Sequence, residues 1–316
     1  MISELQDLHL LRHIEDLAQL QGPVVLAIGV FDGLHLGHRA VIDRACQIAA
    51  EQGGTPVVVT FDPHPIKVLR PDQAPRLLVN TEHKLRLLAE AGLQHVLLIR
   101  FDWDFCRMPA TEFAQAMIDA ANPLGGIVVG ESWRFGKDRG GDLALLQELA
   151  RQNQFHTTGV PPVEVEGEVV SSTRIRAMIT EGNLKGAEQL LGRRFSVFGR
   201  VVEGDHRGRQ LGFPTANVLV GGEQFPPDGV YATAARLDHE WLPSVTNLGW
   251  RPTVKTDQDK TRLLETHLLH GSHNLYGKEI EVRFDRWLRG EQRFESLEAL
   301  QSQIQRDAAA ARNVFS

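Results

Sequence analysis

Apolar runs and helical patterns alternate along the first half of the chain. Short runs rich in Val, Ile and Leu predict strands at 24–30, 56–61, 95–101 and 127–130, and a last strand at 155–160 closes the series. Between them, apolar residues recur at the spacing of amphipathic helices over 38–52, 82–91, 111–121 and 142–153. Strands that are apolar throughout are typical of sheets with helices on both faces. The first half therefore predicts an α/β domain with a doubly wound parallel sheet, in which Thr111 and Asp142 cap the last two helices.

The pattern changes in the second half, where strands follow one another without helices between them. Strands are predicted at 194–203, 230–237, 241–246, 262–269 and 278–287, separated by turns rich in Gly, Pro, Asp and Asn. In the last strand Ile280, Val282 and Phe284 alternate with charged residues, which predicts one buried and one wetted face. This is the pattern of an all-β, antiparallel barrel.

Two helical segments flank the predicted barrel. Residues 175–191 read as a helical stretch that joins the two halves. A final helix is expected from about Ser296, with Leu297, Leu300 and Ile304 on one side.

Composition narrows the class of protein. The chain has 316 residues, which suits two domains, with 42% hydrophobic and 23% charged residues. Its 34 basic and 40 acidic side chains give a net charge of −6, whereas general nucleic-acid or anionic-membrane binders are usually basic. The two cysteines form no CxxC pair, and no apolar run is long enough to span a membrane. We therefore expect a cytoplasmic protein without nucleic-acid or membrane partners.

The segment 29–38 carries the strongest chemical signal. It reads Gly-Val-Phe-Asp-Gly-Leu-His-Leu-Gly-His and joins the strand 24–30 to a helix expected near Arg39. Helix N-termini bind anions, and glycine lets a phosphate approach the backbone. Two histidines three apart are also found as ordinary surface residues or in metal sites, but this context favours phosphate contact for His35 and His38.

Three further segments fit nucleotide chemistry less specifically. Residues 171–176 place three hydroxyls and two arginines at a helix start, as in a phosphate site or an ordinary capped helix. Residues 61–65 and 130–136 follow strands, where ligand loops occur. The prolines of the first also suit a rigid turn, and the aromatics of the second also suit a hydrophobic plug. No P-loop and no G-x-G-x-x-G fingerprint is present.

A second candidate site lies at 204–217. Its glycines and basic residues suit a loop over phosphates, and Thr215 and Asn217 place two oxygen ligands for Mg²⁺ on one face. Taken alone, the last four residues are better explained by a Gly-Pro turn with polar caps. Glu265, on the strand face shared with His267, is a candidate general base only if a substrate hydroxyl lies within reach.

The first set of motifs resembles a known enzyme family. Residues 29–38 with 171–176 look like the Rossmann-like HxGH nucleotidyltransferases, and 62–65 with 133–136 extend the likeness to bacterial FAD synthetase over 14–184. The resemblance implies that the FMN phosphate attacks the α-phosphorus of ATP, giving FAD and pyrophosphate, with His35 and His38 catalytic. The implied ATP-binding residues are Gly29, Phe31, Asp32, His35, His38, Ser172, Thr173 and Arg176. The implied flavin-binding residues are Asp62, His64, Trp133 and Phe135, although Ser132-Trp133 replaces the family's usual Asp-Phe.

The second set resembles riboflavin kinase over 186–308, through 208–217, 247–253, 265–267 and 275–277. The resemblance implies a six-stranded antiparallel Greek-key barrel with a terminal helix, which transfers the ATP γ-phosphoryl group to riboflavin. It implies ATP binding by Gly204, Arg209, Gly212, Thr215 and Asn217, with Thr215 and Asn217 as Mg²⁺ ligands and Glu265 as the base. Two positions depart from the family pattern: 270–274 lack its acidic residues, and Gly290 replaces a proline.

Both resemblances on one chain indicate the bacterial bifunctional riboflavin kinase/FAD synthetase family. They imply an adenylyltransferase domain over 1–184, a kinase domain over 185–316, and Mg²⁺, ATP, riboflavin, FMN and FAD as small-molecule partners. A homo-oligomer is left open. Two alternatives remain at this point: a nucleotidyltransferase with another phosphorylated acceptor, or a flavin-sensing protein whose altered 270–274 segment reflects a degenerate kinase half.

Overall fold

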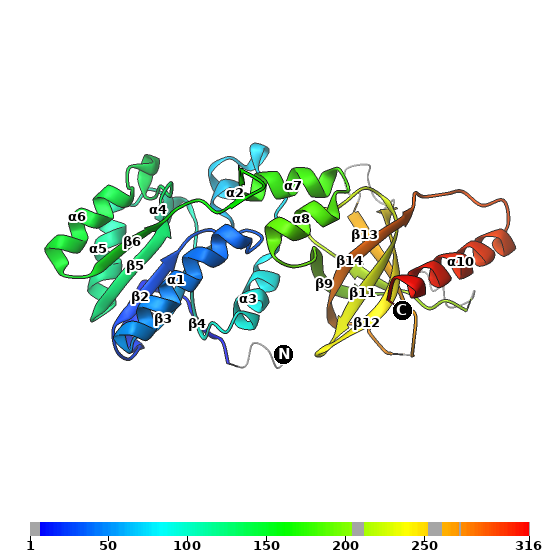
Figure 1. The fold of residues 1–316 in the computed structure, drawn as a ribbon, viewed down its shortest axis with the longest axis horizontal. Coiled ribbons are helices and arrows are strands. Elements are labelled where there is room, and N and C mark those ends of the chain that lie inside the picture. The colour runs from blue at the N-terminus through cyan, green and yellow to red at the C-terminus, as the bar shows by residue number, and fades with distance from the viewer. Residues whose placement is uncertain (1–6, 204–211, 252–260, 272, 316) are drawn as a thin grey trace. The chain divides into compact units, whose positions relative to one another are not determined.

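The computed structural model describes residues 7–203, 212–251, 261–271 and 273–315, which form two compact units (Figure 1). The first unit comprises Met1–Pro75 and Thr81–Ser171, and the second Arg76–Asn80 and Ser172–Ser316. Packing thus divides the chain between residues 171 and 172. The boundary expected between the two catalytic domains, at 184/185, stays a prediction.

The first unit is built on a six-stranded sheet in which every neighbouring pair is parallel. Its order is β1-β4-β3-β2-β5-β6. The strands are β1 (His9–Leu11), β2 (Val24–Ile28), β3 (Thr55–Asp62), β4 (His95–Arg100), β5 (Leu124–Gly130) and β6 (His156–Val160). The predicted doubly wound parallel sheet is confirmed. The edge strand β1 was not predicted, because three residues are too few to show a periodicity.

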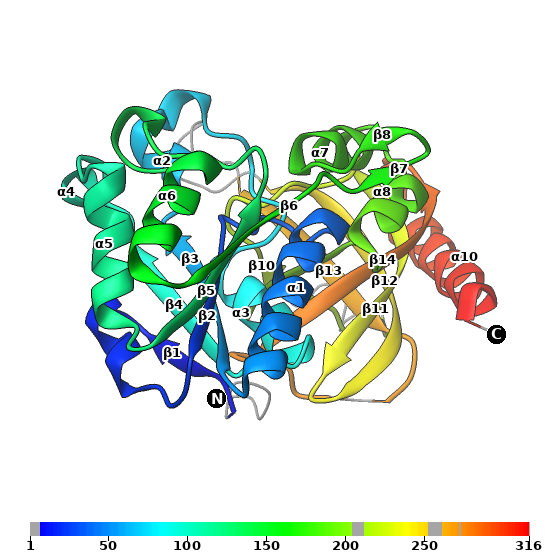
Figure 2. The same ribbon diagram turned by 60° about the vertical axis from the view of Figure 1, so that its left-hand side comes forward.

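Helices cover both faces of this sheet, α1 and α3 on one and α5 and α6 on the other (Figures 1 and 2). The α-helices of the unit are α1 (Leu36–Gln52), α2 (Pro65–Leu69), α3 (Thr81–Glu90), α4 (Trp103–Cys106), α5 (Ala110–Ala120) and α6 (Leu143–Asn153). Short elements are η2 (Ile14–Gln19), η3 (Pro71–Gln73), η4 (Lys137–Arg139), β7 (Glu164–Val165) and β8 (Glu168–Val169). The sheet's apolar side chains are buried beneath them, as the continuous apolar runs predicted.

The helix starts differ in part from the expectation. Asp142 caps α6 as predicted, since its Oδ1 accepts from the Leu145 N–H at 3.1 Å. Thr111 does not cap α5, which begins one residue earlier behind Pro109, whose fixed φ prepares a helix start without a side-chain cap. Helix α1 begins at Leu36 rather than near Arg39, because His35 caps it with a ring nitrogen.

The second unit begins with two helices, α7 (Ser172–Thr180) and α8 (Leu184–Leu191). The helical stretch predicted over 175–191 is therefore present, but it is divided into two helices. Gly182 adopts a left-handed conformation with φ +79, which ends the first helix, and Asn183 caps the second through the Gly186 N–H at 2.9 Å.

A closed six-stranded barrel follows, with every neighbouring pair antiparallel. Its strand order is β10-β13-β12-β11-β14-β9. The elements are β9 (Ser196–Val202), β10 (Ala216–Leu219), β11 (Gly229–Leu237), β12 (Glu240–Arg251), β13 (Thr261–Leu268), β14 (Glu279–Arg289) and the terminal helix α10 (Leu297–Phe315). The barrel and its terminal helix are confirmed.

The alternation in β14 is only half right. Ile280, Val282 and Phe284 are buried inside the barrel as predicted. The opposite face is not wetted throughout, because Glu281 is buried against the Ser196 hydroxyl and Asp285 pairs with Arg194. Strand sequence cannot reveal such cover, since the partners come from other segments.

Helix α10 packs on the barrel wall through small residues. Ala308 and Ala311 join a buried cluster with Val230, Ala232 and Val245, whereas Leu297 is 66% exposed. Leu300 and Ile304 of the expected apolar side are half-buried and lie on the same helix face as Ala308 and Ala311, so only Leu297, at the start of the helix, lies outside the contact. The small side chain of alanine lets the helix approach the strands closely. A hydrophobicity pattern does not show this, because it takes no account of side-chain size.

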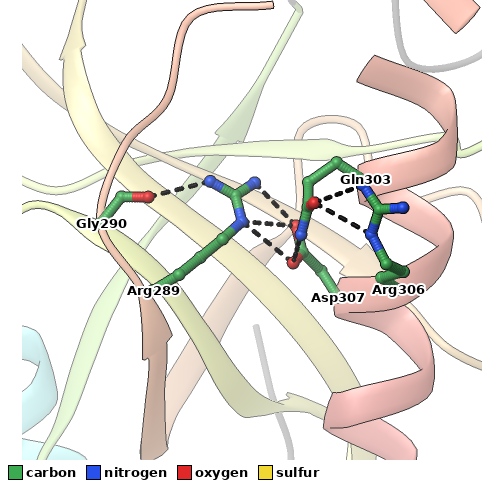
Figure 3. Close-up of polar contacts among 5 residues, drawn as sticks. All are labelled: Arg289, Gly290, Gln303, Arg306 and Asp307. Atoms are coloured by element: carbon green, nitrogen blue, oxygen red, sulfur yellow. Dashed lines mark hydrogen bonds and ion pairs between the residues drawn. The ribbon is translucent and has the colours of Figure 1, made fainter. Parts of the chain in front are cut away.

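One ion-pair cluster also ties α10 to β14 (Figure 3). The Arg289 guanidinium donates to both carboxylate oxygens of Asp307, its Nη2 at 2.7 Å from Oδ2. Gln303 donates to Asp307 Oδ1 at 2.8 Å, and Arg306 in turn donates to Gln303 Oε1. The bidentate pair fixes where the helix lies along the barrel.

Candidate active sites

The turn after β2 lies where ligands bind in doubly wound sheets. Strand β2 pairs with β3 on one side and β5 on the other, so the chain changes its direction of winding between β2 and β5. The segments that follow these two strands, 29–38 and 131–136, leave the carboxyl ends of neighbouring strands. Crevices at such switch points are the usual ligand sites of this fold class.

The turn itself is held in an uncommon conformation. Phe31 and Leu34 have φ of +52 and +45, values that cost about 1–3 kcal/mol for residues other than glycine. The Phe31 ring is buried against Gly29, where a Cβ would lie 2.8 Å from the ring. Phe31 therefore offers a ligand its backbone and not its ring. Asp32, next in the turn, is also buried.

His35 and His38 form one stacked unit at the start of α1. The His38 N–H donates to His35 Nδ1 at 3.3 Å, and the ring centroids lie 3.5 Å apart with an angle of 18°. Since Nδ1 of His35 accepts, the neutral ring carries its proton on Nε2. A Cβ at Gly37 would lie 3.2 Å from the His35 ring, so this glycine leaves room for the stacking.

His38 is the half-buried member of this pair and stays neutral. Burial, the neighbouring His35 and the Lys84 ammonium together hold the pKa of His38 well below 6.5. Its Nδ1 is buried and has no partner among the described residues. The site thus presents two uncharged imidazoles whose ring nitrogens can exchange hydrogen bonds with a ligand.

A buried lysine underlies the turn. Lys84 of α3 donates from Nζ to the Val30 carbonyl oxygen at 3.1 Å and to Thr60 Oγ1 at 3.0 Å. Sequence reasoning missed it, although a signal existed: Lys84 precedes Leu87 and Leu88 by three and four residues, which places it on the apolar face of the helix. Burial lowers the pKa of Lys84 to about 8, against the opposing effect of Asp32 and Asp62.

The first pair of predicted flavin residues follows β3. Asp62 accepts from the Thr81 hydroxyl at 2.5 Å, which fixes its carboxylate at the strand end. His64 caps α2 by accepting from the Ile66 N–H at 3.2 Å. Both residues therefore have a structural role in the turn, and their contact with flavin stays a prediction.

The second pair follows β5. The Trp133 and Phe135 rings stack with centroids 4.6 Å apart and an angle of 12°. Phe135 is buried and also lies 5.9 Å from the Phe113 ring, so it belongs to the core of the unit. Trp133 is half-buried on top of it, which leaves Trp133 as the more accessible of the two.

Ser172, Thr173 and Arg176 lie in the first turns of α7, in the second unit. Thr173 is exposed, and the other two are half-buried. The Arg176 Nε donates to the Arg76 carbonyl oxygen at 2.7 Å, which holds the guanidinium against the segment Arg76–Asn80 of the same unit.

A row of polar residues crosses three strands of the barrel. Asn217 of β10 pairs in register with Glu265 of β13, which pairs with Asn247 of β12. Directly paired residues project to the same face, and the buried Leu264 and Thr266 project to the other, so the row lies on the outer face. The sequence predicted Asn217 and Glu265. It missed Asn247, because only the strand register brings that residue into the row.

Thr215 directly precedes β10 and is half-buried. The carbonyl of Pro214 just before it lies 2.9 Å from His267 Nδ1, and the Phe213 ring meets the His267 ring edge-on at 5.3 Å. Burial lowers the pKa of His267. Gly212 is exposed with φ +84, whereas Gly204 and Arg209 lie outside the described residues.

Asn217 carries a feature that suits a metal ion. It is buried, yet its Oδ1 has no hydrogen-bond partner among the described residues. A buried amide oxygen without a partner is costly, and a hard cation would satisfy it. Elsewhere in the described chain, no group of three or more His, Cys, Asp or Glu side chains is placed to hold a metal.

Family comparisons match each half of the chain. The FAD synthetase family matches residues 17–174, and the riboflavin kinase family matches residues 191–315. No helix in the described part of the chain is both long enough and apolar enough for a membrane span.

Whole-chain relatives cover both halves. The bifunctional riboflavin kinase/FMN adenylyltransferase of Escherichia coli (strain K12) is 40% identical over 308 residues, covering 97% of each chain. That of Pseudomonas fluorescens is 37% identical, covering 96% of this chain and 97% of its own. A crystal structure described as a macrolide-efflux protein from Streptococcus pneumoniae is 29% identical with a TM-score of 0.80, covering 96% of this chain and 99% of that one.

Proposed function

Because this chain belongs to the family of bifunctional riboflavin kinase/FMN adenylyltransferases, we propose that each of the two candidate sites is one of its catalytic centres. The chain is a bifunctional enzyme of flavin-cofactor synthesis. Its C-terminal part phosphorylates riboflavin to FMN with ATP, and its N-terminal part adenylylates FMN to FAD and releases pyrophosphate.

We assign the adenylyltransferase to residues 1–184 and the kinase to residues 185–316. The two family matches, 17–174 and 191–315, fall on either side of this boundary and support it.

The observation that carries the adenylyltransferase assignment is the stacked, neutral His35–His38 pair at the start of α1. The FMN phosphate is already anionic, so its attack on the α-phosphorus of ATP needs no strong base. Catalysis then consists of positioning and of stabilising the charge that moves to the leaving pyrophosphate. Two uncharged imidazoles can donate to phosphate oxygens without a large cost of desolvating a cation.

The family resemblance assigns further residues of each unit to ATP binding. Gly29, Phe31 and Asp32 lie in the turn and would offer backbone groups, next to the N-terminus of α1 that begins at Leu36. Ser172, Thr173 and Arg176 would hold the outer phosphates through hydroxyls, first-turn N–H groups and the guanidinium.

The flavin would lie by Asp62, His64 and Trp133. Trp133 offers an accessible ring for stacking, and Phe135 supports that ring from below. The substitution of Ser132-Trp133 for the family's Asp-Phe makes this the part of the pocket most particular to this chain.

In the kinase centre, Glu265 would accept the proton of the ribityl 5′-hydroxyl as that oxygen attacks the γ-phosphorus of ATP, and ADP leaves. Its place in the outer row beside Asn217 supports this role, because the acceptor base and the ATP phosphates must lie close together. Gly204, Arg209 and Gly212 would cover the phosphates.

Mg²⁺ fits the donors that are present. Thr215 would hold it through its hydroxyl and Asn217 through Oδ1, which has no hydrogen-bond partner in the part of the chain that the structure describes; both are hard oxygen ligands. Bound there with ATP, Mg²⁺ supplies positive charge to the phosphates during transfer. We expect both reactions to use Mg²⁺ with ATP, in the cytoplasm, without nucleic-acid or membrane partners, and a homo-oligomer is compatible with this account.

The proposal is tested by incubating the purified protein with riboflavin, ATP and Mg²⁺ and separating the flavins by chromatography over time. FMN is expected first and FAD after it, with neither formed when EDTA removes the metal. Absence of FAD from FMN and ATP would refute the adenylyltransferase site, and binding of riboflavin without FMN or ADP release would refute the kinase site.

A further inference from the structure

Lys84 is a buried cation that neither reaction above uses. It is 6% exposed, and its ammonium lies between the Val30 carbonyl oxygen and the Thr60 hydroxyl. Removing an ammonium from water is costly, and an apolar side chain of similar length would fill the same space without that cost. Packing alone therefore does not explain a lysine here.

The group that Lys84 holds lies at the start of the catalytic turn. The Val30 carbonyl accepts from Lys84 Nζ at 3.1 Å and from Thr60 Oγ1 at 3.0 Å, so α3 and β3 both fix it. Phe31, whose φ is positive, follows immediately. A strained turn persists only when its surroundings determine its shape, and these two hydrogen bonds fix its first peptide group.

The charge of Lys84 also acts on the catalytic residues. The Lys84 ammonium and the His35 ring both disfavour a proton on His38, in addition to burial. Asp32 and Asp62 are the charged groups that favour the ammonium. The lysine therefore links the shape of the turn to the charge of the imidazoles that the turn presents.

We propose that Lys84 is a positioning residue for adenylyl transfer, which fixes the turn between β2 and α1 through the Val30 carbonyl and disfavours a positive charge on His38 of the stacked pair. This inference rests on the proposed catalytic role of that pair. Lys84 acts through the turn and the two rings.

Lys84→Met tests both effects at once. The Thr60 hydroxyl still donates to the Val30 carbonyl in this variant, so no buried acceptor is left unpaired and the protein should fold. The kcat of FAD formation should fall on the order of 10²-fold, with a much smaller change in the KM for FMN, because the reacting groups are misplaced. Riboflavin phosphorylation by the same protein should be unchanged.

The pH profile separates this role from a merely structural one. Loss of the ammonium removes one group that opposes protonation of His38, so the pKa of His38 should rise. The acid limb of the pH profile, where the rate of FAD formation falls as the pH is lowered, should therefore move to higher pH. Lys84→Gln keeps donors for Val30 but not the charge. It should show the same movement of the acid limb with a smaller loss of kcat, and it decides the question if the Met variant does not fold.

Arg86→Met is the matched control. Arg86 lies on the same helix and is also 6% exposed, but it pairs with Glu82. Its removal should leave the acid limb in place. The inference would be overturned if Lys84→Met and Lys84→Gln both kept the wild-type kcat and acid limb. It would also be overturned if kcat fell equally in these two variants and in Arg86→Met, with no movement of the acid limb. If His38→Ala forms FAD at the wild-type rate, the proposed site fails instead.

Discussion

His38 lies among groups that oppose its positive charge, and its titration tests the description of the first site. Burial, His35 and Lys84 hold its pKa well below 6.5. We expect the His38 signal in an NMR titration of histidine-labelled protein to have its midpoint clearly below 6.5, assigned by its absence in His38→Gln. A midpoint at or above 6.5 would contradict a buried, neutral imidazole.

The same titration has a consequence for stability. Between pH 6.5 and the lower folded-state pKa, the unfolded chain binds a proton that the folded chain does not. The free energy of unfolding should therefore decrease as the pH falls through this window, by about 1.4 kcal/mol per pH unit for one such group. His38→Gln should show a smaller decrease in urea unfolding over the same range.

Asn217 allows a complementary test in the second site. Asn217→Leu keeps the branched shape of the side chain and removes a buried oxygen that has no partner among the described residues, so stability should change little. The Mg²⁺ concentration for half-maximal FMN formation should rise roughly 10–100-fold, as when metal sites are disturbed. FAD formation from FMN serves as the control. An unchanged metal requirement would exclude Asn217 as a ligand.

For single residues, the sequence predicted those candidates that a short, local sequence motif marks. His35 and His38 lie three apart at a helix start, and Asn217 and Glu265 follow strand alternation. Lys84 and Asn247 were missed because helix packing buries the first and strand register aligns the second. Such pairings depend on the tertiary structure.

Among the elements, α10 is the one whose attachment can be tested most cleanly. Its Arg289–Asp307 pair is largely buried and bidentate (Figure 3). Asp307→Leu leaves the Arg289 charge without its partner, so the second unit should lose about 3 kcal/mol of unfolding free energy in urea. Kinase activity should fall with the fraction of folded protein.

Two further variants control this experiment. Arg306→Met removes only an exposed contact to Gln303 and should change stability by less than about 0.5 kcal/mol. The double variant Arg289→Met/Asp307→Leu should recover much of the loss, since no buried charge is left alone. A stable Asp307→Leu single variant would show that the ion pair does not hold the helix.

The sequence predicted which segments are helices and strands better than it predicted where each of them begins and ends. The apolar runs of β2 to β5 predicted the parallel sheet, because buried strands show in composition. The short strands β1 and β10 left no periodic signal. The predicted face of α10 is the one that packs, but its buried contact lies further along the helix, at Ala308 and Ala311, while Leu297 remains exposed.

For the whole chain, the pattern predicted an α/β half followed by a β half, and both are present. The sixth barrel strand came from the family resemblance, since the pattern alone indicated five. The barrel is closed in a chain that carries the altered segment 270–274, so these changes are compatible with the fold. The family relationship then joins the two halves into one reaction sequence from riboflavin to FAD.

The central claim is that this chain carries two separate catalytic centres, one needing His38 and the other Glu265. The most direct measurement is the FAD formed from riboflavin, ATP and Mg²⁺ by His38→Ala, by Glu265→Gln, and by an equal mixture of the two proteins. The account predicts FMN without FAD from the first, neither product from the second, and FAD from the mixture, because free FMN passes between chains. A folded variant that loses both activities, or a mixture that accumulates FMN without FAD, would contradict it.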